Sequence, residues 1–508
     1  MKWLAFLQKS VILLVHICFF VYAPSTRLFL ILNGALNMAN WVKTELSDIS
    51  TGDTRIDSRA IHTVSIFADN FEDSIPEASP THKELTGAYR MLDNDRLEPR
   101  HILEPHMKST IARAEEYASV TIAHDTTEIV VNHSVEGMGK TTTKKCGCYA
   151  HASMAFSPNG TPLGLINTKI WTRDSSRTTR KKLGKEECAK IPFEKRESFK
   201  WIQGVMSVAP LAEAYPDKEW INVCDSESDM YSFYEYCEEL GLPNFHYVIR
   251  ACQDMRMTLL TQDSSEKPVS LRQQIERHST GKPADCYRLP IREREAAVFP
   301  RNRHHAQTQR MATVEVRRFS VYLCSPVKSR KNTSVRVNVV HIKEKGSSKI
   351  KNPIEWILLT SLPVATRKQL RRVREAYEQR WQIELYFRTL KSGCNVEKRR
   401  LRTYSRFAKC LSIYMIIAWR INYITYIARS NPNASCETVF HKKEWQAVEA
   451  YFNNGKVGRT KPPKLTELIL KIARLGGYKQ RKTPPGIETI WRGLNTMGNI
   501  VSCWILFK

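Results

Sequence analysis

The sequence lacks the cysteine spacing on which disulfide frameworks and zinc sites depend. Its 13 cysteines are an odd number with no C-x-x-C pair, and only Cys146 and Cys148 lie close together. Neither a disulfide framework nor a structural zinc site is indicated, and reduced thiols in a cytoplasmic protein are expected. The chain also lacks internal repeats and low-complexity tracts.

Negative charge is scarce as well. Asp and Glu total 51 against 78 Lys and Arg, which gives a formal net charge of +27. Such a surface attracts a polyanion, with nucleic acid the first candidate and an anionic membrane the second. The apolar share of 42% is that of a globular protein, and 508 residues predict roughly two to four domains.

The order of periodic patterns predicts an α/β sheet that follows a helical N-terminal region. Residues 41–108 are polar and helical, and residues 118–131 form a β-branched strand that contains Asp125. Two more strands lie within residues 148–171, joined at Pro158-Asn159-Gly160. Strands and helices then alternate at 194–214 (helix), 220–224 (strand), 230–240 (helix) and 246–251 (strand).

The pattern predicts a β-rich insertion that interrupts this sheet. After the polar segment 262–285, alternating runs occur at 287–299, 311–323 and 334–342. The sheet resumes at 356–362, and a long helix is predicted at 366–392. A further apolar helix at 407–427 is long enough to span a bilayer, but Arg420 and Asn422 within it favour a buried core helix.

One polar pattern stands out on the predicted helix: Tyr377-x-x-Arg380-x-x-x-Glu384, with Lys391 seven residues later. At about 100° per residue these side chains fall within roughly 60° of one another and form one polar stripe. An adjacent apolar stripe can pack on the sheet. Taken alone, the pattern is more typical of a solvated, salt-bridged helix face than of a working surface.

Two further acids change that interpretation. Asp125 lies in a strand and Asp225 at the carboxyl end of another, where sheets present ligands, and Glu227 and Asp229 extend a second acidic cluster. Carboxylates suit a hard cation, so Mg²⁺ is expected, with Mn²⁺ as the alternative. Two such ions roughly 3.5–4 Å apart can promote phosphodiester displacement, while nearby basic residues hold DNA phosphates.

The sequence resembles the bacterial cut-and-paste DDE transposases of insertion sequences, a family that includes the transposase of the composite kanamycin-resistance transposon. The spacing Y-x(2)-R-x(3)-E-x(6)-K is the signature of that group and is complete here. The other matching stretches are Gly52-Asp-Thr-Arg55, Gly87-Ala-Tyr-Arg90, Asp125-Thr-Thr127, Glu197-Ser-Phe-Lys-Trp201, Cys224-Asp225-Ser-Glu227-Ser-Asp229, Trp356-Ile-Leu-Leu-Thr-Ser361 and Ala473-Arg-Leu-Gly-Gly477.

The resemblance implies an α/β fold with a ribonuclease-H-like catalytic core at residues 109–265 and 346–400. A β-rich insertion at 266–345 interrupts this core. A helical DNA end-binding domain at 38–108 precedes it, and a helical dimerisation domain at 401–508 follows. Residues 1–37 have no counterpart in the family.

By the same resemblance, Asp125, Asp225 and Glu384 are the catalytic metal ligands. The implied DNA-contacting residues are Tyr377, Arg380, Lys391, Arg250, Trp356 and Arg388. Trp356 aligns with a tryptophan that stacks on a flipped base, although a strand tryptophan is as often part of a core. Arg250 also has a purely structural alternative. Ser226 departs from the family, whose members often carry Arg there, which puts one local DNA contact in doubt.

The hydrophobic leader at residues 1–37 has two interpretations. Lys2 and Lys9 with the apolar run 11–23 imitate a signal peptide, and a second apolar run follows at 28–36. The segment is either an export or membrane signal, or in-frame sequence upstream of a functional start at Met38. Because the expected substrate is cytoplasmic DNA, we favour the start at Met38 and a cytoplasmic protein.

The predicted function is therefore a magnesium-dependent endonuclease and strand transferase of DNA transposition. We expect it to bind terminal inverted repeats and target DNA as a homodimer, with hairpin formation implied by the resemblance and no small-molecule substrate. One rival is a catalytically silent DNA-binding inhibitor or domesticated relative. Another is an exported or membrane-anchored protein, and it rests only on residues 1–37.

Overall fold

The computed structural model describes residues 40–173, 191–262, 267–291, 309–325, 334–347, 350, 352–479 and 483–506. The predicted leader, the start at Met38 and part of the strand predicted at 287–299 lie outside the described residues. The chain forms two compact units. The first takes its described residues from Met1–Tyr117, Thr126–Lys190 and Gln382–Lys508, and the second from Ala118–Asp125 and Ile191–Trp381.

The first unit begins with the predicted helical region. Its helices are α2 (Asn40–Glu45), α3 (Thr54–Asp69), α4 (Ile75–Ala78), α5 (His82–Asp93) and α6 (Pro99–Ala114). The side chains of Asp53, Ser74 and Thr81 accept hydrogen bonds from backbone N–H groups in the first turns of α3, α4 and α5. These caps satisfy donors that a helix start leaves unpaired, and so fix where each helix begins.

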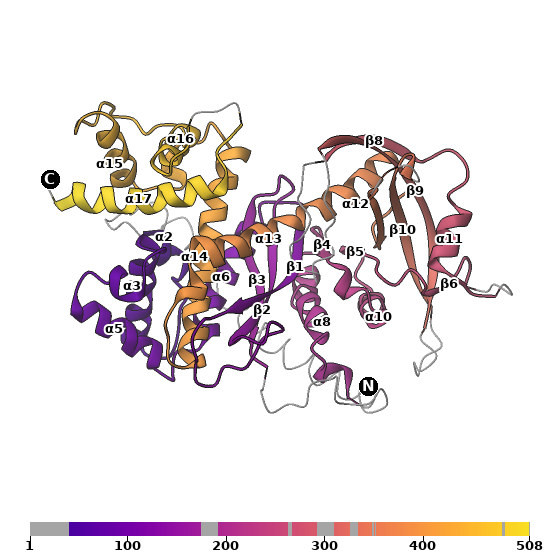
Figure 1. The fold of residues 1–508 in the computed structure, drawn as a ribbon, viewed down its shortest axis with the longest axis horizontal. Coiled ribbons are helices and arrows are strands. Elements are labelled where there is room, and N and C mark those ends of the chain that lie inside the picture. Colours follow the sequence, from indigo (N-terminus) through magenta and orange to yellow (C-terminus); the bar gives the residue numbers. More distant parts are fainter. Residues whose placement is uncertain are drawn as a thin grey trace. The chain divides into compact units, whose positions relative to one another are not determined.

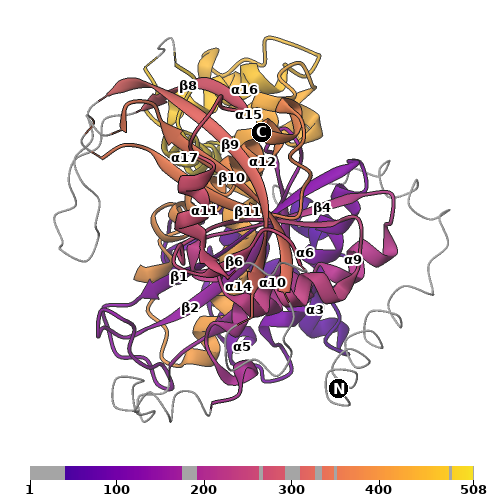
Figure 2. The same cartoon turned by 90° about the vertical axis from the view of Figure 1, so that its right-hand side faces the viewer.

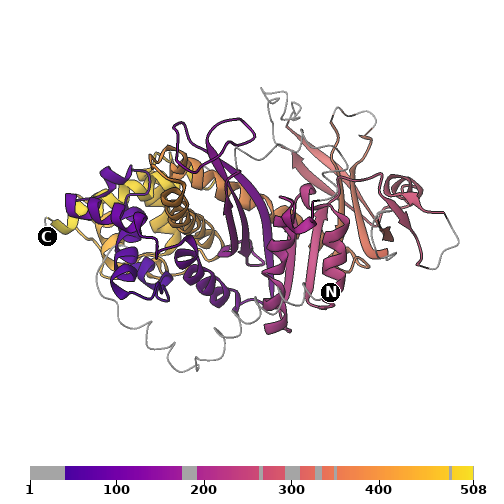
Figure 3. The same ribbon diagram turned by 90° about the horizontal axis from the view of Figure 1, so that it is seen from below.

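A hairpin in the first unit matches its predicted turn. Strands β2 (Gly147–Phe156) and β3 (Pro162–Trp171) pair antiparallel, and Gly160 in the turn adopts a φ of 81°. The long helix α14 (Tyr404–Ser430) packs against α6 and β3, and Figures 1 and 3 show the indigo N-terminal helices beside this orange helix. Trp419 of α14 is buried and its indole nitrogen donates to the Pro162 carbonyl at 2.9 Å.

Helix α14 is the one candidate membrane span among the described residues, by length and composition. Within its most apolar window, 78% of the residues are buried inside the protein. Burial in a folded unit therefore accounts for its apolar composition, as the sequence analysis favoured. The helices that surround its C-terminal half are α15 (Lys442–Phe452), α16 (Leu465–Leu475) and α17 (Ile487–Leu506), grouped together in Figure 1.

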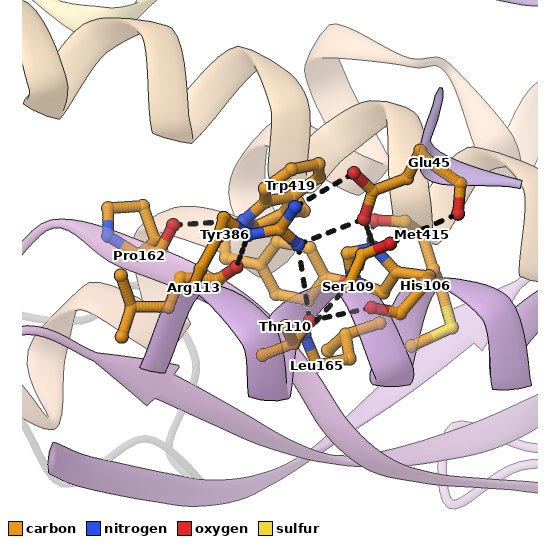
Figure 4. Close-up of polar contacts among 11 residues, drawn as sticks. Glu45, His106, Ser109, Thr110, Arg113, Pro162, Leu165, Tyr386, Met415 and Trp419 are labelled. Atoms are coloured by element: carbon orange, nitrogen blue, oxygen red, sulfur yellow. Dashed lines mark hydrogen bonds and ion pairs between the residues drawn. The ribbon is translucent and has the colours of Figure 1, made fainter. Parts of the chain in front are cut away.

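A buried polar network joins α2, α6 and β3 within the first unit (Figure 4). Glu45 accepts from both terminal nitrogens of Arg113, at 2.8 and 2.9 Å, and lies 2.5 Å from Nδ1 of His106. Nε2 of His106 accepts the backbone N–H of Leu165 at 3.0 Å, so the ring is neutral and Nδ1 carries the proton that it donates to Glu45. The guanidinium of Arg113 lies 4.3 Å from the Trp419 ring centroid.

The second unit is built on a mixed sheet. Its strands follow the order β1-β4-β5-β11-β10-β9-β6-β7, with β8 also paired to β9. Strands β9, β10 and β11 lie beside one another (Figure 2). Strands β1, β4 and β5 are parallel, and the others pair antiparallel. The strand bounds are β1 (Ser119–Val130), β4 (Glu219–Cys224), β5 (Phe245–Arg250), β6 (Met257–Leu259), β7 (Val269–Ser270), β8 (Asp285–Ile291), β9 (Arg310–Cys324), β10 (Ser334–Glu344) and β11 (Glu355–Thr360).

Helix α12 (Arg367–Gln379) covers one face of this sheet. Its buried Leu370, Val373 and Ala376 pack on Val223 and Val248 in one hydrophobic cluster. The unit's other helices are α8 (Phe199–Met206), α9 (Ala209–Ala214), α10 (Tyr231–Leu240) and α11 (Leu271–Arg277). The alternation of valine and isoleucine along the strands supplies the face that α12 buries.

The prediction of one uninterrupted helix at 366–392 was wrong. The segment divides into α12, α13 (Trp381–Arg388) and a π-helix (Thr389–Gly393). The π-turn adds a residue to the repeat, so the assumed 100° spacing no longer holds at Lys391. Tyr377 is also buried, with 7% of its surface exposed, and is not part of a solvent-facing stripe.

Candidate active site

Strand register brings Asp125 and Asp225 side by side in the second unit. The parallel pairing of β1 with β4 ends at His124 opposite Cys224, so the next residue on each strand is an aspartate. Neighbouring strands lie about 4.8 Å apart, and residues in register point to the same face. Both carboxylates are partly exposed and lie on the face that α12 covers.

Arg250 extends the same row. The pairing of β4 with β5 ends at Cys224 opposite Ile249, which places Arg250 beside Asp225. Arg250 is exposed, in contrast to the buried Val248 that precedes it on the same face. Two acids and one base therefore lie across three adjacent strands, where they can hold a cation and a phosphate next to each other.

Helix α12 carries two more predicted residues to this row. Nη1 of Arg380 lies 3.6 Å from Oδ2 of Asp125. Burial raises the pKa of Tyr377, while the nearby positive charges of Arg380 and Arg250 oppose that rise. Tyr377 also contacts Trp356 of β11, with ring centroids 5.7 Å apart and an interplanar angle of 63°. Trp356 is only partly buried against the hydrophobic cluster.

Neutral, hydrogen-bonded groups lie next to both aspartates. Oδ1 of Asp225 accepts from the Ser226 hydroxyl at 2.8 Å and the Glu227 backbone at 2.9 Å. His124, directly before Asp125, is buried and hydrogen-bonds through Nε2 to Asn222 at 3.0 Å. Burial lowers the pKa of His124 to about 4, so no positive charge arises beneath the carboxylates near neutral pH.

The second acidic cluster expected around Asp225 does not form. Glu227 is exposed and pairs with Lys200 at 3.1 Å, whereas Asp229 is buried and pairs with Arg256 at 2.8 Å. Within the described ranges, no group of three or more His, Cys, Asp or Glu side chains is assembled as a metal site. In the row described above, the carboxylates are those of Asp125 and Asp225, and the Arg380 guanidinium places positive charge beside Asp125.

The remaining predicted residues belong to the first unit. Glu384 lies in the first turn of α13 and is partly exposed. Arg388 forms an ion pair with Glu488. Lys391 lies in the π-helix, and burial lowers its pKa, while the charges of Glu397 and Glu128 oppose this.

A basic groove in the N-terminal helices was not among the predicted site residues. Its cationic side chains come from α3, α5 and the turn after α5: Arg55, Arg59, Lys83, Arg90 and Arg96. Asp53 orients two of them, with carboxylate distances of 3.2 Å to Arg55 and 3.8 Å to Arg96. A Cβ at Gly87 would meet Arg59 at 2.8 Å, so glycine leaves room for that guanidinium. The Gly-Asp-Thr-Arg and Gly-Ala-Tyr-Arg stretches were the available signal.

Three protein-family models match separate parts of this chain. Residues 38–97 match the transposase DNA-binding model, and residues 209–420 match the transposase DDE domain model. These two matches support a DNA transposase. Residues 416–504 match the model of the Tn5 transposase dimerisation domain.

Among solved structures, the chain is similar to the piggyBac transposase in a cryo-EM synaptic complex with hairpin DNA. The two share 12% sequence identity, with 77% of this chain and 72% of that chain covered. The TM-score is 0.32, so the likeness is too distant to support conclusions about fold or mechanism.

Proposed function

We propose that this protein is a cut-and-paste transposase of the Y-R-E-K signature group, related to the transposase of the composite kanamycin-resistance transposon. The observation that carries the proposal is the row of Asp125, Asp225 and Arg250 across three adjacent strands of a chain with transposase domains. In this proposal the mixed sheet belongs to a ribonuclease-H-like core with a β-rich insertion.

Asp125 and Asp225 would hold Mg²⁺, or Mn²⁺ in its place, together with Glu384. Glu384 enters the proposal through the sequence signature. The bound cations supply charge that activates an attacking oxygen and stabilises a leaving one. Arg250 and Arg380 would hold the phosphates that flank the scissile bond. The guanidinium of Arg380 lies over the Tyr377 ring, 5.8 Å from its centroid, and this contact helps to orient Arg380.

The N-terminal groove would bind the terminal inverted repeat. Its five cationic side chains can neutralise phosphates. Lys391 and Arg388 of the first unit would add further phosphate contacts. The C-terminal helices would pair two protomers when the two element ends are brought together, with target DNA bound afterwards, all in the cytoplasm.

The proposed reaction order is a nick, attack of the released 3′ hydroxyl on the opposite strand to form a hairpin, hairpin opening and strand transfer. Each step is a displacement at phosphorus and needs alignment and positive charge more than a protein nucleophile. The alternative is a catalytically silent DNA-binding inhibitor. Both aspartates stand in register at the sheet edge, which favours the enzyme.

A labelled duplex that carries the element's own end tests the proposal. With Mg²⁺ we expect a nick at the junction with flanking DNA, followed by a hairpin product that migrates as a fold-back strand under denaturing conditions. A chelator should abolish both products and leave end binding intact. End binding with no metal-dependent cut would favour the inhibitor, and a double-strand break without any hairpin would refute the proposed pathway.

A further inference from the structure

Asp229 is a fully enclosed carboxylate, unlike the acids that precede it in the same turn. Oδ1 accepts from the Tyr234 hydroxyl at 2.8 Å and lies 2.8 Å from Nη2 of Arg256. Oδ2 accepts the consecutive backbone N–H groups of Cys252 and Gln253, at 2.8 and 2.9 Å. Only 1% of the Asp229 side chain and 7% of the Arg256 side chain are exposed.

The backbone of Asp229 takes part in the same set of contacts. Its carbonyl accepts from Nε2 of Gln253 at 2.8 Å and from Nη2 of Arg256 at 2.9 Å. The Cys252 thiol also donates to the Ser226 carbonyl at 3.1 Å. We call Asp229 and these partners the Asp229 clamp. It fastens the turn that follows β4 to the loop that follows β5.

Stability alone does not account for this arrangement. Burying two charges costs a large desolvation energy, and apolar replacements of buried ion pairs are often as stable or more stable. The ion pair and its directional hydrogen bonds instead hold the two segments that they join in one fixed geometry. The turn begins at Asp225 and the loop begins directly after Arg250. The clamp therefore fixes the positions at which the chain leaves β4 and β5, next to these two site residues.

We propose that Asp229 is a positioning residue, which acts through Arg256 and the loop backbone to hold Asp225 and Arg250 in the arrangement that binds cation and DNA phosphate. The proposal rests on the proposed function, because it assigns Asp229 an effect on the Asp225 metal site. Asp229 itself, enclosed by its partners, contacts neither DNA nor metal. Outer partners of metal ligands typically change metal affinity or activity by about 10–100-fold when they are replaced.

The test uses the full chain and follows Mn²⁺ binding by the EPR signal of the free ion. Asp229→Asn should weaken Mn²⁺ binding about 10-fold or more, while affinity for end DNA through the N-terminal groove is unchanged. The control is Asp254→Asn, because Asp254 lies in the same loop but pairs with Arg272 at 2.8 Å. It should bind Mn²⁺ as the unmodified chain does.

Because Asp229→Asn leaves Arg256 buried without its partner charge, a double variant with Arg256→Gln is measured alongside it. This variant should fold and still bind Mn²⁺ weakly, since neutral side chains cannot reproduce the clamp. A folded double variant with normal Mn²⁺ binding, or failure of both variants to fold, would overturn the positioning role. Asp225→Ala separates the two claims. If Asp225→Ala leaves Mn²⁺ binding unchanged, the proposed metal site is wrong. If Asp225→Ala abolishes Mn²⁺ binding and Asp229→Asn does not weaken it, only the positioning role fails.

Discussion

At the scale of single residues, neighbours across the sheet decide what each side chain can do. Asp225 and Asp229 are four positions apart, yet one lies at the open sheet edge and the other is closed in by Arg256. The sequence pattern showed only a run of acids, because burial of Asp229 depends on a loop that arrives from β5. The placement of Asp125 within a strand and of Asp225 directly after one, by contrast, could be predicted from the apolar runs before them.

Trp356 offers the first prediction. Its ring meets Tyr377 edge to face and is only partly buried, and in the proposed function it would stack on a flipped base. Trp356→Ala should slow hairpin formation and opening by about 5–150-fold, which corresponds to the roughly 1–3 kcal/mol of one base–aromatic stack. Gel analysis of single-turnover reactions should show first-strand nicking unaffected.

Two controls accompany Trp356→Ala. Trp356→Phe should retain most of the hairpin rate, because an aromatic face remains. An abasic site at the flipped position should partly rescue the alanine variant. Loss of first-strand nicking in step with hairpin formation would instead make Trp356 a core residue.

Asp69 carries a pH prediction for the first unit. Burial raises the pKa of Asp69 to about 7, from an ordinary value of 3.8. Burial also raises the pKa of the neighbouring Glu444 to about 7. The charge of Arg420 opposes this rise, and the charge of Asp69 adds to it. A carboxyl group with a raised folded-state pKa favours the fold fully below its unfolded pKa and loses that contribution as pH passes through 7.

Asp69→Asn should therefore raise the unfolding temperature most at pH 8, clearly less at pH 5, and hardly at all below the ordinary pKa of 3.8. A gain of at least about 2–4 °C is expected for a unit of this size, measured by circular dichroism. An equal shift at both pH values would contradict the raised pKa.

At the scale of elements, strongly periodic segments were predictable and their irregularities were not. The strand predicted at 220–224 is β4 (Glu219–Cys224), and the helix predicted at 407–427 is the core of α14 (Tyr404–Ser430). Helix α11 (Leu271–Arg277) was missed inside a polar segment, although Ser270 and Gln273 form a readable capping box. The π-helix depends on packing, because Gly393 lies against Trp491. No local sequence pattern predicts it.

The network around Glu45 ties elements together and yields a stability prediction. Burial tends to raise the pKa of Glu45, but the hydrogen bond from His106 and the charge of Arg113 outweigh it and lower the pKa to about 2. A lowered folded-state pKa stabilises the fold above the ordinary value of 4.5, and that contribution is lost as pH falls toward 2. Glu45→Gln should thus destabilise the protein at pH 7 by up to about 3–5 kcal/mol, because Arg113, with 23% of its side chain exposed, loses its counter-charge in a largely buried network.

Denaturant unfolding at pH 7 measures this effect. Asp48→Asn is the matched control, since Asp48 pairs with Lys108 on the surface and more than half of each side chain is exposed. Its effect should stay below about 1 kcal/mol. Equal losses of unfolding free energy in the two variants would show that the Glu45 network stabilises the fold no more than a surface ion pair does.

At the scale of the whole molecule, the excess of positive charge should govern DNA affinity. Each neutralised phosphate contributes about 0.9 to the slope of log affinity against log salt for duplex DNA. Lys391→Ala should flatten that slope by about this amount and weaken binding to all sequences alike. Lys398→Ala, an exposed lysine seven residues away, is the matched comparison. Fluorescence anisotropy across a salt series measures both, and an unchanged slope for Lys391→Ala would remove Lys391 from the DNA interface.

The most direct test of the central claim is metal-dependent nicking of a labelled element end by single-residue variants of the full chain. Asp125→Ala, Asp225→Ala and Glu384→Ala should each reduce nicking to the level seen with a chelator, while end-DNA affinity stays within about two-fold of the unmodified chain. Glu227→Gln, an exposed acid beside Asp225 that pairs with Lys200, should cut normally. Normal Mg²⁺-dependent nicking by any of the three alanine variants would contradict the assignment of that residue as a metal ligand, and normal nicking by all three would contradict the account as a whole.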